Sequence, residues 1–413
     1  MNKTSQRVAV LLLVFISTID SLYVAELVLR HYLPLNEGTT FEHRIPHPVL
    51  GWTSEPGLTF NNRMDEATVS VFYNKAGFHD REHAYENPAG AYRIVVLGDS
   101  FMEAYSVELG GAFHSLIEKI AKSKGIDVEV INLGVGGYGT LQEYLAYREI
   151  GRKYKPDLVL LAFNSSNDVR DNSREIESLV IGSRVNRVPY VDLSGPGGWN
   201  ITPVDYAGAM ESFKKGRAET GSIRATLERR SVIFRMVSKE VSRNIRKLSK
   251  KFDAGQERDS VSPTARQDDF YRSGIYYCNE PEAYTRAWEI TERIVQHLKQ
   301  EIERDRAKLV VLSVPAIAET YPAATRKANP SAGKFDPLCY EDPPGYGRSR
   351  DLFRKFNLEY IDLLPVFRKK AGADGIYLFR KSDRHWNEDG HALAAQVVFS
   401  TLEQKGYFKT AKR

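Results

Sequence analysis

The sequence predicts an α/β fold in which a parallel sheet lies between two layers of helices. Short apolar runs alternate with helical segments, a pattern that favours parallel strands joined by right-handed crossovers. Each run is apolar along its length, as expected of strands that are buried on both faces. The composition, with 42% hydrophobic and 11% aromatic residues, excludes a largely disordered chain.

The predicted strands begin at residue 93. The strands expected in the sheet are residues 93–97, 128–131, 158–163, 309–314 and 358–362. The helices expected between or after them are residues 111–124, 141–154, 283–304 and 388–403. A small strand or hairpin at residues 69–74 precedes them. Ligands of open parallel sheets bind beyond the carboxyl ends of the strands, so we expect the site at that edge.

Four regions are predicted along the chain. Residues 1–34 form a signal anchor or transmembrane helix, and residues 35–90 form an extension that packs on the main domain. The main domain comprises residues 91–168 and 282–413. Residues 169–281 are too many for a simple connection, so we expect them to form an inserted subdomain with basic helices.

The N-terminal segment has the features of a secretory signal that is kept as an anchor. Lys3 and Arg7 precede an apolar span at residues 8–29, which is long enough to cross a bilayer. Asp20 and Glu26 make that span costly. A cleaved signal and a buried helix of a soluble protein are the alternatives. The early positive charges indicate a cytoplasmic amino end and an extracytoplasmic main domain.

Charge and cysteine content narrow the partners further. The net charge of +5 is small for 413 residues, and no nucleic-acid partner is expected. Residues 213–251 carry thirteen Lys or Arg and three Glu, which predicts basic helices that either face an anionic surface or are solvated. Cys278 and Cys339 stand in no metal-binding pattern. Whether they form a disulfide is left open by the sequence.

Three polar or glycine-rich segments follow the first three predicted strands. Residues 98–101 (Gly-Asp-Ser-Phe) place Ser100 at a strand-to-helix turn, where its own N–H can donate to an oxyanion. The glycine-rich segment at residues 132–140 lets backbone approach a ligand closely. Residues 164–168 offer a side-chain amide beside the same crevice.

A fourth segment, residues 382–391, supplies a base. The imidazole of His385 has the ordinary pKa needed to take a hydroxyl proton near neutrality, and a carboxylate can fix its tautomer. Asp383 lies two residues earlier. In an extended segment, side chains at that spacing point the same way, so the two side chains can pair.

These four segments, in this order, resemble the sequence blocks of the SGNH hydrolase family, named for its Ser, Gly, Asn and His site residues. The resemblance covers residues 92–168 and 358–402. It implies a flavodoxin-like α/β/α fold with Ser100 as the nucleophile and His385 as the general base. It places Gly137 and Asn167 in the oxyanion hole beside the Ser100 N–H, with Gly136 as a competing glycine.

The sequence departs from the family pattern in its third and last blocks. Ser165 stands where the third block usually has glycine, and Ser382 stands where the acid usually precedes the histidine. The run from Asp383 to Trp386 is instead similar to the Asp-x-His-Trp arrangement of the alginate O-acetylation proteins, which are periplasmic and transfer acetyl groups to polysaccharide. Asp383 is therefore assigned as the partner of the base.

Several neighbouring residues receive lesser roles. Phe101, where the family usually has leucine, adds weight to a transferase function, and His391 is interpreted as a helix-start histidine. The candidate accessory residues are Asp99, Gly136, Asp168 and Trp386. No metal or organic cofactor is needed for the implied acyl transfer through Ser100.

The expected function is that of an extracytoplasmic serine esterase that removes short acyl groups, acetyl first among them, from a cell-surface or exported glycan. A polysaccharide O-acetyltransferase with the same site residues is one alternative. A non-catalytic glycan-binding or assembly protein is another. A lipid-ester hydrolase, with its basic helices against the membrane, is a third.

Overall fold

A computed structural model of the chain describes residues 3–32, 43–64, 67–180, 184–194, 196–220, 273–328, 337–373, 377–381 and 383–410, together with residue 271 and several positions between 227 and 241. The chain divides into two units. One is made of Met1–Glu37 and Met210–Ser260, and the other of Gly38–Ala209 and Val261–Arg413. The second unit holds the sheet and every predicted site residue.

A five-stranded parallel sheet forms the centre of the second unit. Its strands are β5 (Tyr92–Leu97), β6 (Val128–Asn132), β7 (Leu158–Phe163), β10 (Lys308–Ser313) and β11 (Glu359–Ile361). Their spatial order is β11-β10-β7-β5-β6, and every pairing is parallel. Numbered along the chain, this is the flavodoxin-like order 2-1-3-4-5. The predicted fold class and the five predicted strands are confirmed.

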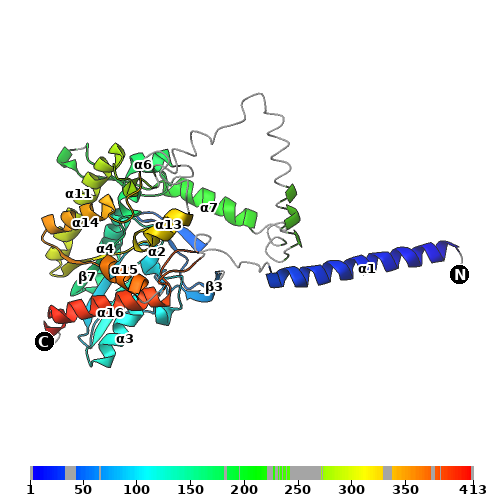
Figure 1. The fold of residues 1–413 in the computed structure, drawn as a ribbon, viewed down its shortest axis with the longest axis horizontal. Helices are drawn as coiled ribbons and strands as arrows, with labels where there is room; N and C mark the ends of the chain where they lie inside the picture. The colour runs from blue at the N-terminus through cyan, green and yellow to red at the C-terminus, as the bar shows by residue number, and fades with distance from the viewer. Residues whose placement is uncertain are drawn as a thin grey trace. The chain divides into compact units, whose positions relative to one another are not determined.

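Helices cover both faces of this sheet (Figure 1). The helices on one face are α3 (Phe113–Ser123), α15 (Leu364–Ala373) and α16 (Glu388–Gln404). The helices on the other are α4 (Thr140–Glu149), α11 (Glu282–Arg304) and α14 (Pro344–Lys355). Within β5, Ile94 and Val96 join the first layer of core and Val95 and Leu97 join the second. This alternation is the reason that the strands are apolar at every position.

Some elements differ from the prediction. The helix expected at residues 141–154 ends at Glu149 and is followed by a 3-10 turn, Gly151–Tyr154. Neither α14 nor α15 was predicted. Pro344 begins α14, which also contains Gly345 and Gly347, residues of low helix propensity, so tertiary packing of Leu352 and Phe353 outweighs the local preference.

Two antiparallel hairpins precede the sheet. They pair β1 (Arg44–His47) with β2 (Gly51–Ser54), and β3 (Thr59–Arg63) with β4 (Thr68–Phe72). The second is the hairpin expected near residues 69–74. The Tyr138 hydroxyl donates to the Trp52 carbonyl (2.6 Å), and the Gln142 amide donates to the Leu50 carbonyl (2.6 Å). The first hairpin is thereby tied to the start of α4, next to the predicted glycine-rich segment.

The described part of residues 169–281 contains short elements. These are α6 (Arg174–Leu179), the hairpin of β8 (Tyr190–Asp192) with β9 (Asn200–Thr202), and α7 (Tyr206–Thr220), preceded by α5 (Asp168–Asp171). Most of the predicted basic helices lie outside the described residues. Two further short helices, α12 (Ile317–Thr320) and α13 (Pro322–Ala328), follow β10.

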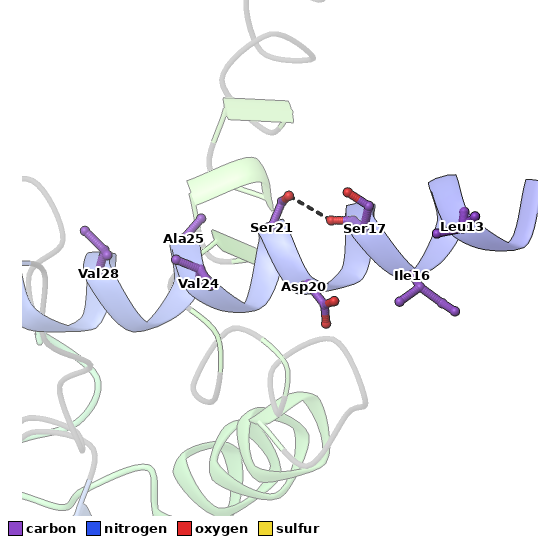
Figure 2. A pocket seen from close by; sticks show the side chains of 8 residues that line it. All are labelled: Leu13, Ile16, Ser17, Asp20, Ser21, Val24, Ala25 and Val28. Carbon is purple, nitrogen blue, oxygen red and sulfur yellow. Dashed lines mark hydrogen bonds between the residues drawn. The ribbon is translucent and has the colours of Figure 1, made fainter. Parts of the chain in front are cut away.

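The N-terminal helix α1 (Lys3–Tyr32) belongs to the other unit. Among the described residues it alone is long and apolar enough to cross a membrane, over Leu12–Leu29. Within this span, the Glu26 carboxylate accepts hydrogen bonds from the Ser231 hydroxyl and the Ile233 N–H, each at 3.0 Å. The Ser21 hydroxyl likewise donates to the Ser17 carbonyl (Figure 2). Some polar groups in the span therefore have hydrogen-bond partners within the protein.

A shallow hollow runs along α1. Figure 2 shows the eight side chains that line it, namely Leu13, Ile16, Ser17, Asp20, Ser21, Val24, Ala25 and Val28. They recur every three or four residues and so form one stripe of a single helix. The hollow contains none of the predicted site residues.

Cys278 and Cys339 form a disulfide with an S–S distance of 2.06 Å, which answers the question that the sequence left open. The bond joins the residues before α11 to those before α14, 61 positions apart. Disulfides persist in oxidising compartments, so the pairing agrees with the predicted extracytoplasmic main domain.

Replacing both cysteines by serine should lower the Tm of the protein by roughly 5–10 °C. In the chain-entropy account, a crosslink spanning 61 residues stabilises the fold by about 4 kcal/mol. Thermal unfolding followed by circular dichroism, with and without reductant, measures this difference. Reductant should lower the Tm of the parent but leave that of the double variant unchanged. Equal Tm values for the parent and the variant under oxidising conditions would contradict the expectation.

Candidate active site

The carboxyl ends of β5, β6 and β7 bring three of the predicted segments to one edge of the sheet. Ser100 is the first residue of the short helix α2 (Ser100–Glu103), which follows β5. The glycine-rich segment follows β6, and Asn167 is the N-cap of α5 after β7. Because β5 pairs with β6 on one side and β7 on the other, the three segments are neighbours.

Ser100, His385 and Asp383 form a hydrogen-bonded chain. The Ser100 Oγ lies 2.7 Å from His385 Nε2, and His385 Nδ1 lies 3.1 Å from Asp383 Oδ2. A carboxylate only accepts, so Nδ1 carries the proton and Nε2 is left to accept from the serine hydroxyl. This is the arrangement that activates a serine as a nucleophile.

The predicted reason for the pairing of Asp383 with His385 is wrong in one respect. Arg384 between them has a φ of +66°, in the left-handed region, so the segment is not extended there. The turn is held from both sides. The Arg380 N–H donates to the His385 carbonyl (2.7 Å), and the Ser106 hydroxyl donates to the Trp386 carbonyl (2.7 Å). These backbone contacts, rather than strand geometry, direct the two side chains toward each other.

The pKa of His385 is raised above its ordinary value. Burial by itself lowers this pKa, whereas the hydrogen bond and the charge of Asp383, together with the charge of Asp99, raise it by more. The side chains of His385 and Asp383 are 19% and 25% exposed, so the pair is reachable from one side. An imidazole that gains basicity is suited to accept a proton from Ser100.

Asp99 orients the amide of Asn167. Its Oδ2 accepts from the side-chain amides of Asn164 (2.9 Å) and Asn167 (2.8 Å), and its Oδ1 accepts from the Phe101 N–H (2.9 Å). Asp99 is fully buried, and burial raises its pKa, although all three hydrogen bonds favour the charged form. One N–H of the Asn167 amide remains for a ligand after the bond to Asp99 is made.

Both candidate glycines occupy positions that a side chain could not share. Gly137 has a φ of +75°, and a Cβ there would lie 2.8 Å from Arg184 Nη1. A Cβ on Gly136 would lie 2.5 Å from Arg44 Nη2 and 3.3 Å from the Ser100 Cβ. The N–H of Gly136 already donates to the Glu103 carboxylate at 2.7 Å. Of the two glycines, Gly137 is therefore the one whose N–H is left for an oxyanion.

The other candidate residues have supporting positions. Asp168 is fully buried and accepts from the Asn164 N–H (2.9 Å), which fixes the turn after β7. Trp386 is fully buried, donates to the Pro315 carbonyl (3.2 Å) and packs edge-on against Phe101. His391 is the fourth residue of α16 and is also fully buried.

Several contacts around the site were not predicted from the sequence. The Tyr105 hydroxyl lies 3.0 Å from His385 Nδ1 and 3.3 Å from Asp383 Oδ1, so it touches both members of the pair. Ser165, the departure in the third block, lies with its hydroxyl 3.4 Å from the Glu319 carboxylate. Tyr105 lies only five residues after Ser100, and this short separation is the one feature of the sequence that could have placed it near the site.

No group of three or more His, Cys, Asp or Glu side chains in the described part of the chain is arranged to hold a metal ion. The polar atoms at the site are hydroxyl, imidazole, carboxylate, amide and backbone N–H groups. These groups can carry out acyl transfer through a serine nucleophile.

Residues 270–413 match the family described as "SGNH hydrolase-like domain, acetyltransferase AlgX". The predicted resemblance is thereby confirmed. The matched part includes Asp383, His385 and Trp386, and Ser100 lies outside it. No functionally curated protein has a sequence that matches the chain.

Several solved esterase structures are also similar. An acetyl xylan esterase, AlAXEase, is 15% identical over 75% of this chain and 99% of that one, with a TM-score of 0.36. The psychrotrophic esterase EstA from Pseudoalteromonas sp. is 9% identical over 76% and 98%, with a TM-score of 0.37. A lipase/acylhydrolase from Enterococcus faecalis is 13% identical over 76% and 96%, with a TM-score of 0.36. These scores are low, and the assignment of the fold rests on the strand order.

The imidazole of His385 should titrate above pH 6.5, and Asp383→Asn should lower its pKa. The carboxylate stabilises the protonated ring, so its loss favours the neutral form and moves the midpoint toward acid pH. NMR titration of the histidine ring signals, assigned with His385→Gln, measures both midpoints. Asp389→Asn, an exposed carboxylate of α16, is the control and should leave the midpoint unchanged. A midpoint insensitive to Asp383→Asn would show that the pair does not form.

Proposed function

We propose that this chain, whose residues 270–413 match an SGNH hydrolase-like domain, is a serine esterase that removes short acyl groups from an extracytoplasmic glycan. The observation that carries the proposal is the hydrogen-bonded chain from Ser100 through His385 to Asp383, at the sheet edge that also holds the N–H donors of Gly137 and Asn167. Such a chain activates a hydroxyl, and such donors stabilise a tetrahedral oxyanion.

The first half-reaction would form an acyl enzyme. The Ser100 proton passes to His385 Nε2 as Oγ bonds to the ester carbonyl carbon. Negative charge develops on the carbonyl oxygen, where the N–H groups of Ser100 and Gly137 and the amide of Asn167 can donate. The tetrahedral intermediate collapses, the ester C–O bond breaks, and the leaving alkoxide takes the proton from Nε2.

The second half-reaction would release the acyl group. A water molecule or an acceptor hydroxyl loses its proton to His385 Nε2 and attacks the acyl carbon. Collapse of this second intermediate breaks the bond to Ser100 Oγ, which regains its proton from Nε2. Throughout, the Asp383 carboxylate supports the imidazolium and does not itself take the proton.

The proposed compartment and substrate draw on three features. The α1 span would anchor the chain in the membrane with its amino end in the cytoplasm, and the Cys278–Cys339 disulfide fits an oxidising environment. The Asp-x-His-Trp run is similar to that of the alginate O-acetylation proteins, which favours acetyl groups and a glycan. The basic residues at 213–251 would suit an anionic surface such as lipid headgroups.

A polysaccharide O-acetyltransferase is the second candidate. The observation that favours it is the match of residues 270–413 to the acetyltransferase AlgX family, which includes both the base and its acid. The site residues and the acyl enzyme would be the same. The two candidates differ only in whether water or a sugar hydroxyl takes the acyl group from Ser100.

The full-length protein in detergent should release p-nitrophenol from p-nitrophenyl acetate, and Ser100→Ala should reduce kcat/KM by about 10³-fold or more. Ser123→Ala is the matched control, because this exposed hydroxyl lies at the end of α3, and it should leave the rate unchanged. Acetyl groups found on an added glycan would favour the transferase. A folded Ser100→Ala protein with parental turnover would contradict both candidates.

A further inference from the structure

We infer that Glu103 is a positioning residue that sets the oxyanion hole by holding the backbone of Gly136. The inference rests on the proposed function of Ser100 and adds to it a residue that belongs to none of the four sequence blocks. Glu103 is 1% exposed and is the last residue of the helix that Ser100 begins. It therefore connects the nucleophile to the glycine-rich segment.

The Glu103 carboxylate accepts three hydrogen bonds. Its Oε2 accepts from the Gly136 N–H at 2.7 Å, and its Oε1 accepts from the Tyr73 hydroxyl at 2.5 Å and the Ser54 hydroxyl at 3.4 Å. The pKa of Tyr73 is raised well above its usual value, by burial first and then by the Glu103 charge, so the phenol stays neutral and donates. The carboxylate has no role in the proton transfers proposed above.

The two peptides that follow the one held by Glu103 are hydrogen-bonded as well. The Trp52 indole N–H donates to the Gly136 carbonyl (3.3 Å), and the Arg184 guanidinium donates to the Gly137 carbonyl (2.7 Å). No cis peptide bond occurs in the described residues, so the Gly137 N–H points opposite to the Gly136 carbonyl, away from Trp52. Glu103 holds the preceding peptide through the Gly136 N–H, so the peptides on both sides of Gly136 are held and the direction of the Gly137 N–H is restrained with them.

This glycine loop lies next to the nucleophile. The point where a Gly136 Cβ would stand is 3.3 Å from the Ser100 Cβ, 2.6 Å from Glu103 Oε2 and 2.5 Å from Arg44 Nη2. A shift of the loop by an ångström would therefore move the Gly137 donor relative to Ser100. Donors of an oxyanion hole act over a narrow range of distance, so such a shift slows the reaction without weakening substrate binding.

A buried negative charge beside an oxyanion would oppose catalysis if it stood alone. Arg44 supplies the balancing positive charge, because its guanidinium and the Glu103 carboxylate both lie next to the position that a Gly136 Cβ would occupy. Burial lowers the pKa of Arg44, and the charge of Glu103 opposes that effect. The pair leaves the loop close to neutral while keeping the hydrogen bond to Gly136 strong.

Two substitutions with side chains about as long as that of Glu103 distinguish the loss of the hydrogen bond to Gly136 from a change in side-chain volume. Glu103→Met removes the acceptor for the Gly136 N–H, whereas Glu103→Gln keeps an amide oxygen that can accept from it. With p-nitrophenyl acetate, kcat per active site should fall roughly 10- to 100-fold in Glu103→Met and by less than about threefold in Glu103→Gln, with KM unchanged in both. Active sites are counted by stoichiometric phosphonylation of Ser100, so a partly unfolded preparation does not lower the value.

Glu108→Met is the control, since this exposed carboxylate lies near α2 and accepts from the Ser70 N–H. Its kcat per active site should equal that of the parent. Equal kcat per active site in Glu103→Met and the parent would overturn the inference, as would an equal loss in the Met and Gln variants. If Glu103→Met does not fold, Tyr73→Phe takes its place and should lower kcat about threefold, and an unchanged kcat would overturn the inference. Full activity in Ser100→Ala would instead defeat the proposed function.

Discussion

The parallel pairing of β5 with β6 and β7 is the constraint on which the site depends. Val96 stands opposite Asn132 of β6, and Leu97 stands opposite Leu161 of β7, so the three strands end within a residue or two of one another. A shift of one residue would turn every side chain to the opposite face, and two buried layers of core oppose such a shift. The positions of Ser100, Gly137 and Asn167 follow from this register.

Buried carboxyl groups surround the proposed oxyanion hole, and the protein limits their charge. Burial raises the pKa of Glu143 and Asp168 well above the usual range, and the charges of nearby carboxylates, among them Asp99 and Asp171, add to that shift. Burial therefore favours the neutral form of both groups. Asp99 and Glu103 are instead surrounded by N–H and O–H donors, and Arg44 balances Glu103. A site that stabilises a developing anion requires that nearby negative charge be neutralised in this way.

Local sequence patterns were sufficient to predict the fold and to locate the four sequence blocks of the site. The continuous apolar runs predicted all five strands, and the turns after β5, β6 and β7 predicted where Ser100, Gly137 and Asn167 would lie. The choice between Gly136 and Gly137 depends on which way one peptide faces, and that is set by Trp52 and Glu103, which are distant in sequence. No periodicity contains this information.

Contacts between segments that are distant in the sequence could not be predicted from local patterns. Tyr105 contacts His385 across 280 positions. Arg44, in the first hairpin, lies beside Gly136, and Tyr73, which follows the second hairpin, donates to the Glu103 carboxylate. The left-handed conformation of Arg384, which is uncommon for a non-glycine residue, is held by hydrogen bonds from Arg380 and Ser106. Each of these features is a product of tertiary packing.

The most direct test of the central claim is covalent labelling of the full-length protein with an organophosphonate ester, followed by mass spectrometry of its peptides. Such a reagent bonds to a serine hydroxyl that is activated by a base and stabilised by oxyanion donors. The account predicts one phosphonate per chain, on Ser100, and labelling that is strongly slowed by His385→Ala. Labelling of another serine, or none in the folded parent, would contradict it.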